Sequence, residues 1–123
     1  IEGGLSGWKH ALDLLAPRVT LLAVKDSKWV DVPGLAMPAQ ERRWVPVGSG
    51  NVRWREVLGA LRQAGFDGWA SIHCEYQGRW TYRELNTAEV LEHGAADLRF
   101  IRGVGGGGFG GQMIGGGGLP HER

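Results

Sequence analysis

Apolar side chains recur at helical spacing near the start of the chain. They stand at i, i+3, i+4 and i+7, and are Trp8, Ala11, Leu12 and Leu15. Because this spacing places them on one face, it predicts an amphipathic helix over about residues 6–16. Ser6 is suited to cap its N-terminus, and Pro17 is suited to stop it.

Two segments have the pattern of strands. Residues 19–24 are a nearly unbroken apolar run, rich in β-branched residues and followed by Lys25 and Asp26. Such a run is typical of a strand buried on both faces. Residues 69–76, which follow the glycine-flanked turn at 65–68, are predicted to form a second strand.

Helical spacing returns twice more. The first stripe consists of Trp54, Val57, Leu58 and Leu61, and Gly65 stands where a C-terminal cap is expected. The second stripe consists of Leu91, Ala95, Leu98 and Ile101. Asn86, with Glu89 three residues later, resembles a capping box and predicts a helix over about residues 87–102.

Residues 27–53 show no clear periodicity and predict a long connection. Prolines and glycines interrupt it, at Pro33, Gly34, Pro38, Pro46, Gly48 and Gly50. The connection also carries Trp29 and Trp44. A loop of this length in a compact domain is more often functional than idle.

The predicted order is helix, strand, helix, strand, helix, which indicates an α/β fold. Strands that alternate with helices pair in parallel through right-handed crossovers. Two strands alone leave unpaired edges and half-covered helices, so neighbouring elements are expected from an upstream part of the fold or from an oligomer partner.

Composition divides the 123 residues into a folding unit, 1–102, and a glycine-rich tail, 103–123. The tail contains a literal G-x-G-x-x-G at Gly103, Gly105 and Gly108. A dinucleotide-binding fingerprint follows a strand and opens a helix, whereas this one follows a predicted helix. The tail is therefore expected to be a flexible linker or a disordered end.

Charge and cysteine content exclude several classes of function. Fourteen basic and thirteen acidic side chains give a net charge of +1 without a basic cluster, which argues against nucleic acid as a partner. Cys74 is the only cysteine, and its position in the strand pattern favours a buried thiol. No apolar run is long enough for a membrane span, and residues 1–4 do not have the pattern of a leader. A cytoplasmic protein is expected.

Several segments together resemble the sugar phosphate isomerase/epimerase family of xylose isomerase-like TIM barrels. The similar segments are Glu2-Gly3-Gly4 with Gly7-Trp8, Val24-Lys25-Asp26, Trp44 to Gly50, Trp54 to Leu58, Ala64 to Gly68, and Ser71 to Tyr76. The resemblance implies the C-terminal part of a (β/α)8 barrel, with the first strands upstream. It also implies a carbohydrate substrate and a divalent metal ion (Mn, Mg, Co or Zn), held by carboxylates and histidine at the strand ends.

Alternation along the two strands agrees with that placement. Ser71, His73 and Glu75 share one face of the second strand, and Lys25 shares a face with Ala23 in the first. If the other, apolar set faces the outer helices, these polar side chains point into the barrel near its catalytic rim.

We therefore expect Glu75 and Lys25 to be catalytic, and His73, Glu75 and Asp26 to be metal ligands. The residues expected to bind substrate are Trp29, Trp44, Gly48 and Gly50. Each also has a structural alternative. His73 and Glu75 could form a buried hydrogen-bonded pair, and Lys25 and Asp26 could be a solvated strand end. The tryptophans could pack the loop, and the glycines could form a plain turn.

Two positions depart from the family pattern. Ala23 stands where many members have histidine, and His73 stands where they commonly have glutamate. The leading hypothesis is an isomerase or epimerase of a sugar, a sugar phosphate or a polyol that works by metal-assisted proton transfer, as part of a complete barrel. The alternatives are a non-catalytic barrel remnant and, less favoured by the near-neutral charge, a relative of abasic-site endonucleases.

Overall fold

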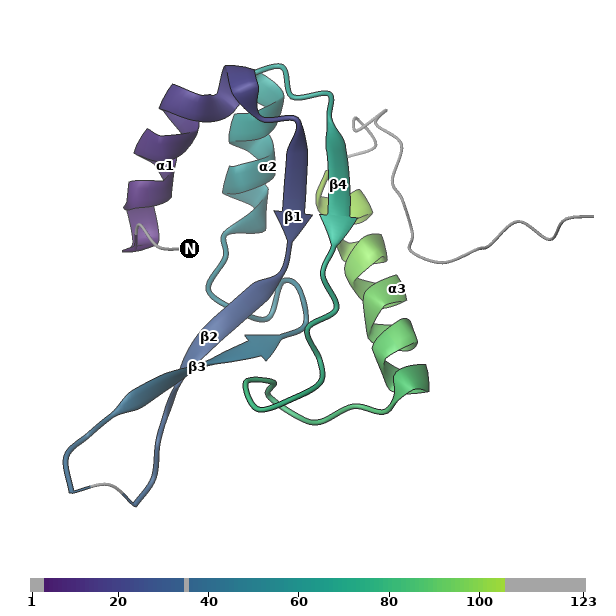
Figure 1. The fold of residues 1–123 in the computed structure, drawn as a ribbon. Coiled ribbons are helices and arrows are strands. Elements are labelled where there is room, and N and C mark those ends of the chain that lie inside the picture. The colour runs from purple at the N-terminus through teal and green to yellow at the C-terminus, as the bar shows by residue number, and fades with distance from the viewer. Residues whose placement is uncertain (1–3, 35, 106–123) are drawn as a thin grey trace, which may run out of the picture.

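Two parallel strands form the centre of the fold, and helices pack against one of their faces (Figure 1). The structure, a computed structural model, describes residues 4–34 and 36–105. Its helices are α1 (Gly4–Leu15), α2 (Trp54–Gln63) and α3 (Thr87–Val104), and a 3₁₀ turn spans Ala16–Arg18. Its strands are β1 (Leu21–Val24), β2 (Asp26–Asp31), β3 (Gln40–Val45) and β4 (Trp69–Ile72).

The central strands β1 and β4 pair in parallel, as the alternation of strands and helices predicts. Leu22 lies opposite Ala70, and Val24 lies opposite Ile72. The amide of His73 donates to the carbonyl of Val24 at 2.9 Å, so the pairing continues one residue beyond β4. Both strands therefore end at the same edge, which is the condition for their C-terminal side chains to meet.

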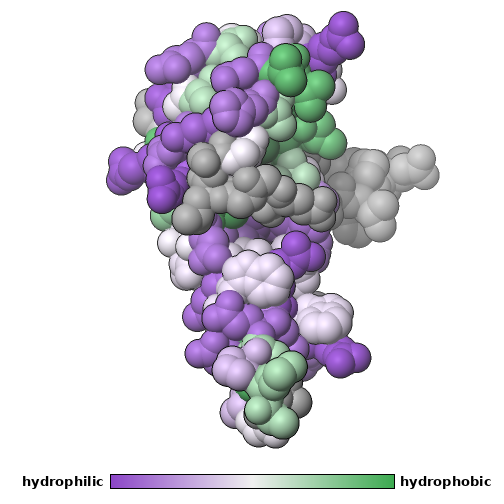
Figure 2. Space-filling model, turned by 90° about the vertical axis from the view of Figure 1, so that its left-hand side faces the viewer, coloured by the Kyte–Doolittle hydropathy of each residue, from purple (hydrophilic) through white to green (hydrophobic). Residues whose placement is uncertain are grey.

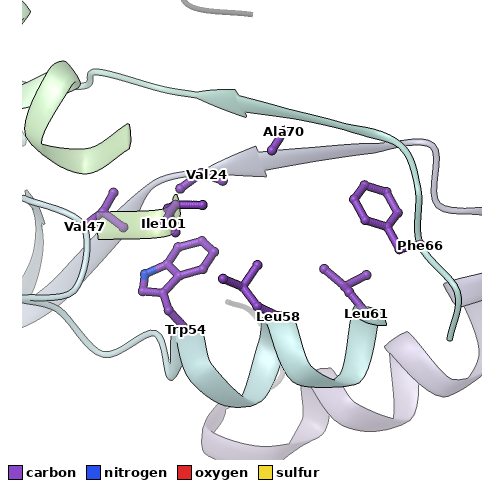
Figure 3. Close-up of a cluster of buried hydrophobic side chains, with 8 residues drawn as sticks. All are labelled: Val24, Val47, Trp54, Leu58, Leu61, Phe66, Ala70 and Ile101. Atoms are coloured by element: carbon purple, nitrogen blue, oxygen red, sulfur yellow. The ribbon is translucent and has the colours of Figure 1, made fainter. Parts of the chain in front are cut away.

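The helix-facing side of this pair holds the hydrophobic core (Figure 3). Val24 and Ala70 point from the strands toward α2, and Ile101 reaches the same cluster from α3. Leu58 and Leu61 of α2 are each 1% exposed. Burying a leucine side chain to this extent contributes about 1.5–3 kcal/mol, so α2 is anchored mainly by these residues.

The opposite side of the pair is open. Leu21 and Trp69, which lie opposite each other, are 58% and 40% exposed. Folded proteins normally cover apolar sheet faces, and a barrel of this kind has eight strands with its helices outside. The described residues form no closed barrel; they correspond to part of one, with the open side as its inner wall.

The end of α2 confirms the predicted cap. Gly65 has a φ of +75°, a conformation that costs glycine little. Its amide bonds to the carbonyl of Arg62 at 2.9 Å, and the amide of Phe66 bonds to the carbonyl of Leu61 at 3.0 Å. This pair of bonds is a Schellman motif, which stops the helix and turns the chain toward β4.

The first helix confirms the predicted stripe only in part. It ends at Leu15 before Pro17, as expected, but it begins at Gly4, so Ser6 lies inside the helix and is not its N-cap. Leu12 packs against the core, whereas Leu15 is exposed. The side of α1 that carries Leu15 is therefore left without a described neighbour.

The last helix has the predicted capping box but not the predicted buried face. The Asn86 side chain accepts from the Glu89 amide at 3.0 Å, and the Glu89 carboxylate accepts from the Asn86 amide at 2.9 Å. Leu91 is 67% exposed, whereas the buried residues are Asp97 and Ile101. The face that packs is rotated toward Asp97 because that carboxylate has buried hydrogen-bond partners.

The predicted long connection contains a β-hairpin, so the expectation of an irregular loop is wrong there. Strands β2 and β3 pair antiparallel from Asp26 opposite Val45 to Asp31 opposite Gln40, and the hairpin projects away from the helices (Figure 1). Both of its faces carry charged or polar side chains, so the sequence of its strands lacks the apolar alternation that identifies a half-buried strand.

Three smaller expectations can also be compared with the structure. β4 ends at Ile72, four residues before the predicted end, and Cys74 is exposed, so its expected burial is wrong. Gly103 and Val104 belong to α3, and the predicted tail from residue 106 onward lies outside the described residues. No helix in the described part of the chain combines the length and apolarity needed to cross a membrane.

Candidate active site at the ends of β1 and β4

Lys25 and Glu75 form an ion pair just beyond the ends of the central strands. Lys25 Nζ lies 2.7 Å from Glu75 Oε1, and the two side chains are 38% and 36% exposed. His73 Nδ1 lies 3.9 Å from the same carboxylate oxygen. The structure thus brings together three of the side chains that the sequence places on one face.

The register of the strands explains this meeting. Lys25 follows Val24 and His73 follows Ile72, and these preceding residues lie opposite each other. Alternation from Ala23 and Ser71 on the open side carries Lys25 and His73 to that same side. The pair therefore stands at the C-terminal end of parallel strands, where barrel enzymes hold their active sites.

Trp44 of β3 lies next to this ion pair. Lys25 Nζ is 4.6 Å from the centroid of the Trp44 ring, within the range of a cation–π interaction. Both residues line a cavity of about 720 Å3 that is bordered by α1, β1, β3 and α2. The cavity is mostly apolar, with Lys25 and Arg42 as its charged groups.

A second cavity lies along the hairpin. Its volume is about 490 Å3, and its lining consists of Trp29, Glu41, Arg42, Trp44 and Trp80. Figure 2 shows pale aromatic side chains standing out among polar ones on the lower part of the molecule. The expected substrate-binding residues Trp29 and Trp44 thus border one hollow that begins beside the Lys25–Glu75 pair.

Asp26 lies elsewhere, although it follows Lys25 directly. It is 2% exposed, on the helix side, and it accepts five hydrogen bonds. The donors are the amides of Ser27, Gly48, Gly50 and Val52 and the indole of Trp54, at 2.8–3.3 Å. Both oxygens of this carboxylate are thus engaged in hydrogen bonds within the fold, and the metal-binding role expected for Asp26 stays a prediction.

The same bonds account for Gly48 and Gly50. Their amides, which were expected to face a substrate, donate to Asp26 Oδ2. Gly48 has a φ of +90°, and a side chain at Gly50 would collide with the Asp26 carboxylate. Both glycines therefore fit the alternative of a tight turn, which here is organised around Asp26.

A second buried carboxylate, Asp97, was missed by the sequence analysis. It is 2% exposed and accepts from the Val47 amide at 2.9 Å and from the Tyr76 hydroxyl. Burial raises the pKa of Asp97 above its usual value and raises that of Tyr76 too. The sequence did contain a signal for this residue. The positions spaced i, i+4, i+7 and i+11 over residues 90–101 form one helical face, and Asp97 is a polar residue at the centre of that face.

The ligand set for a metal ion is incomplete among the described residues. Among residues 4–34 and 36–105, no group of three His, Cys, Asp or Glu side chains is placed to hold a metal. His73 and Glu75 supply two donors, and Glu75 is already paired with Lys25. Catalytic zinc sites use three protein ligands, so the described residues do not fit a metal site by themselves.

Parallel strands, helices on one face and polar side chains at the strand ends define this molecule as an α/β barrel protein. A family model described as xylose isomerase-like TIM barrel matches residues 6–101. The match covers most of the chain, which therefore belongs to the xylose isomerase-like TIM barrel family. Comparison with curated proteins and with solved structures gave no match.

Proposed function

We propose that this chain contributes the Lys25–Glu75 pair to the active site of a barrel enzyme that isomerises or epimerises a sugar or polyol. The observation that carries the proposal is the 2.7 Å ion pair on the open side of β1 and β4. Membership of the xylose isomerase-like family supports the class of reaction. The adjoining cavity, which Lys25 and Trp44 line, gives a ligand room beside the ammonium group.

Proton transfer is the chemistry that suits the pair. Glu75 takes a proton from the carbon next to a substrate carbonyl, and the C–H electrons move to form a carbon–carbon double bond. The carbonyl oxygen gains the negative charge, which Lys25 stabilises through one of its three N–H donors. For isomerisation, the hydroxyl proton on the first carbon moves to the former carbonyl oxygen, and the abstracted proton returns to the former carbonyl carbon, so that the carbonyl group moves by one position. Return of the proton to the opposite face of the first carbon gives an epimer.

The half-exposed position of the pair suits this task. A base must reach its proton at about 2.6–3.2 Å, so it has to be accessible to substrate. Asp26 and Asp97, each 2% exposed, cannot meet that condition. If a divalent ion takes part, His73 and Glu75 are the residues of this chain that would hold it, with further ligands from outside the described residues.

Turnover of a panel of sugars and polyols by the full-length protein tests the proposal. Glu75→Gln keeps the size of the side chain but removes the base, and we expect a loss of about 10²–10⁴-fold in kcat, the range typical of a general base. Glu92→Gln, on the exposed surface of α3, is the matched control and should keep wild-type turnover. An unchanged rate in Glu75→Gln would remove Glu75 from the mechanism.

A further inference from the structure

Each residue of the Lys25–Glu75 pair is followed along the chain by a buried polar residue. Asp26 comes directly after Lys25, and Tyr76 comes directly after Glu75. Both of these following residues are 2% exposed, whereas the two ion-paired side chains are accessible. At each strand end, an accessible charged residue thus stands next to a residue that is anchored in the interior.

The anchor at Tyr76 matters because the sheet no longer holds the chain at Glu75. Strand β4 ends at Ile72, and the amide of His73 makes the last bond to β1. Beyond that bond, the amide of Glu75 donates only to the nearby carbonyl of His73, at 3.0 Å. Tyr76 is therefore the first residue after β4 that fixes this segment to the rest of the fold.

The two anchors are connected through one turn. The amide of Gly48 donates to Asp26 Oδ2 at 3.0 Å, and the preceding amide, that of Val47, donates to Asp97 Oδ1 at 2.9 Å. The other oxygen of Asp97 accepts a hydrogen bond from the Tyr76 hydroxyl. Consecutive amides of the turn are thus bonded to two buried carboxylates, one directly after β1 and one that holds the chain after β4.

Helix α3 holds this turn in place from the other side. Asp97 belongs to α3, and a side chain at Gly48 would collide with the ring of Phe100, one turn further along the same helix. Val47 belongs to the hydrophobic core cluster, as does Ile101 of α3 (Figure 3). No buried side-chain nitrogen or oxygen among the described residues lacks a partner, so the network is fully bonded and therefore rigid.

We propose that Tyr76 and Asp97 are positioning residues that hold the Glu75 carboxylate in place for its reaction. Their hydrogen bond fixes the backbone next to Glu75, and the turn relates that backbone to the one next to Lys25. The 2.7 Å separation of the pair is thereby set from the interior. The inference rests on the proposed function, because it assigns the support of the same two reacting groups.

Crystal structures of full-length variants test the inference without a substrate. Tyr76→Phe keeps the buried ring and removes only the hydroxyl that Asp97 accepts from. We expect the Lys25 Nζ–Glu75 Oε1 separation to increase from 2.7 Å to beyond about 4 Å, the limit for an ion pair. The separation should increase because the chain after β4 loses its anchor.

Tyr82→Phe is the matched control. Tyr82 lies in the same loop, and its hydroxyl is 2.9 Å from Nε2 of His93, which also belongs to α3. The substitution removes the same group, but the lost bond does not reach Asp97 or the turn at Val47. The Lys25–Glu75 separation should therefore remain near 2.7 Å in this variant.

Steady-state kinetics measure the consequence for the reaction. The substrate is the sugar or polyol of the panel that the wild-type enzyme converts fastest. We expect Tyr76→Phe to lower kcat about 10–100-fold, because a base displaced by about 1 Å can cost 10²-fold. KM should change much less, because the positioned base acts in the transition state, whereas the side chains lining the cavity are unchanged. Tyr82→Phe should keep both constants.

Two substitutions of Asp97 separate geometry from buried charge. Asp97→Ala removes the acceptor for the Val47 amide and for the Tyr76 hydroxyl, so it should displace the pair as Tyr76→Phe does. Asp97→Asn keeps an oxygen for the amide and offers N–H donors to the tyrosine oxygen. It should therefore restore the short separation and most of kcat.

Three results would overturn the inference. They are a Lys25–Glu75 separation that stays near 2.7 Å in both Tyr76→Phe and Asp97→Ala, equal kinetic losses in Tyr76→Phe and Tyr82→Phe, and no recovery in Asp97→Asn relative to Asp97→Ala. If Tyr76→Phe displaces the pair but Glu75→Gln turns over normally, the proposed function alone fails. If Glu75 is needed but the pair does not move in Tyr76→Phe, this inference alone fails.

Discussion

The two sides of the β1–β4 pair use carboxylates in opposite ways. On the helix side, Asp26 and Asp97 are each 2% exposed; Asp26 accepts five hydrogen bonds and Asp97 accepts two. On the open side, Glu75 is about one-third exposed and holds one cation, Lys25. Adjacent residues show the contrast directly, because Lys25 and Asp26 point to different sides. A buried, hydrogen-bonded carboxylate fixes the loop, whereas an accessible ion pair is available to a substrate.

The largest stability effect should come from Asp26. Asp26→Ala leaves four backbone amides and the Trp54 indole without their acceptor, and unsatisfied buried groups cost about 1–3 kcal/mol each before water compensates. We expect a loss of about 3–5 kcal/mol in the free energy of unfolding of the full-length protein, measured by denaturant titration. Asp26→Asn, which keeps one acceptor oxygen, should lose less.

The matched change on the open side is Lys25→Met. An ion pair with this exposure is worth about 1 kcal/mol or less, so its removal should hardly change the unfolding free energy. Comparable losses of unfolding free energy in Lys25→Met and Asp26→Ala would contradict the difference between the two sides of the β1–β4 pair.

Substitution of Leu21 tests whether the open side of β1 and β4 is the inner wall of a barrel. Leu21 is 58% exposed here, but in a complete barrel neighbouring strands and layers of side chains would cover it. Leu21→Ser in the full-length protein should therefore cost about 1.5–3 kcal/mol. Leu14→Ser, at a position 80% exposed on α1, is the control. If both substitutions are neutral in denaturant titration, the open side is a true surface.

Asp97 should give a small effect, visible as a pH dependence. Its pKa is raised in the folded state, mainly by burial, so its contribution to stability is fully present below its unfolded pKa near 4. That contribution is lost as the pH rises through the folded pKa, because the folded state then holds the extra proton. Asp97→Asn keeps an acceptor for Val47 and a partner for Tyr76 without titrating.

The wild-type protein should therefore lose stability relative to Asp97→Asn as the pH rises from about 4 toward neutrality. Unfolding free energies of both proteins, measured across this range at constant ionic strength, give the comparison. Parallel pH profiles would mean that Asp97 does not carry a raised pKa in the folded protein.

The sequence predicts the elements that repeat a strong pattern. The spacing of Trp54, Leu58 and Leu61 and the cap at Gly65 place α2 correctly, and strand alternation places Lys25 and His73 on one side. These features depend on periodicity and on local backbone conformation, both of which are encoded by neighbouring residues.

Features that depend on distant partners were not predictable in the same way. The hairpin carries no apolar alternation because both of its faces bear charged or polar side chains, so its strands resembled a loop. The sequence suggested a ligand site at Asp26, Gly48 and Gly50. It does not show that the amides of the two glycines donate to the Asp26 carboxylate. Asp97 interrupts an apolar stripe, and it accepts a hydrogen bond from the hydroxyl of Tyr76, which lies 21 residues away in the sequence.

A crystal structure of the full-length protein with a bound sugar-derived inhibitor tests the central claim most directly. The account predicts Leu21 and Trp69 buried by neighbouring strands, with Lys25 Nζ and the Glu75 carboxylate within hydrogen-bonding distance of the ligand. A ligand seated away from Lys25 and Glu75, or an open side that remains exposed to solvent, would contradict it.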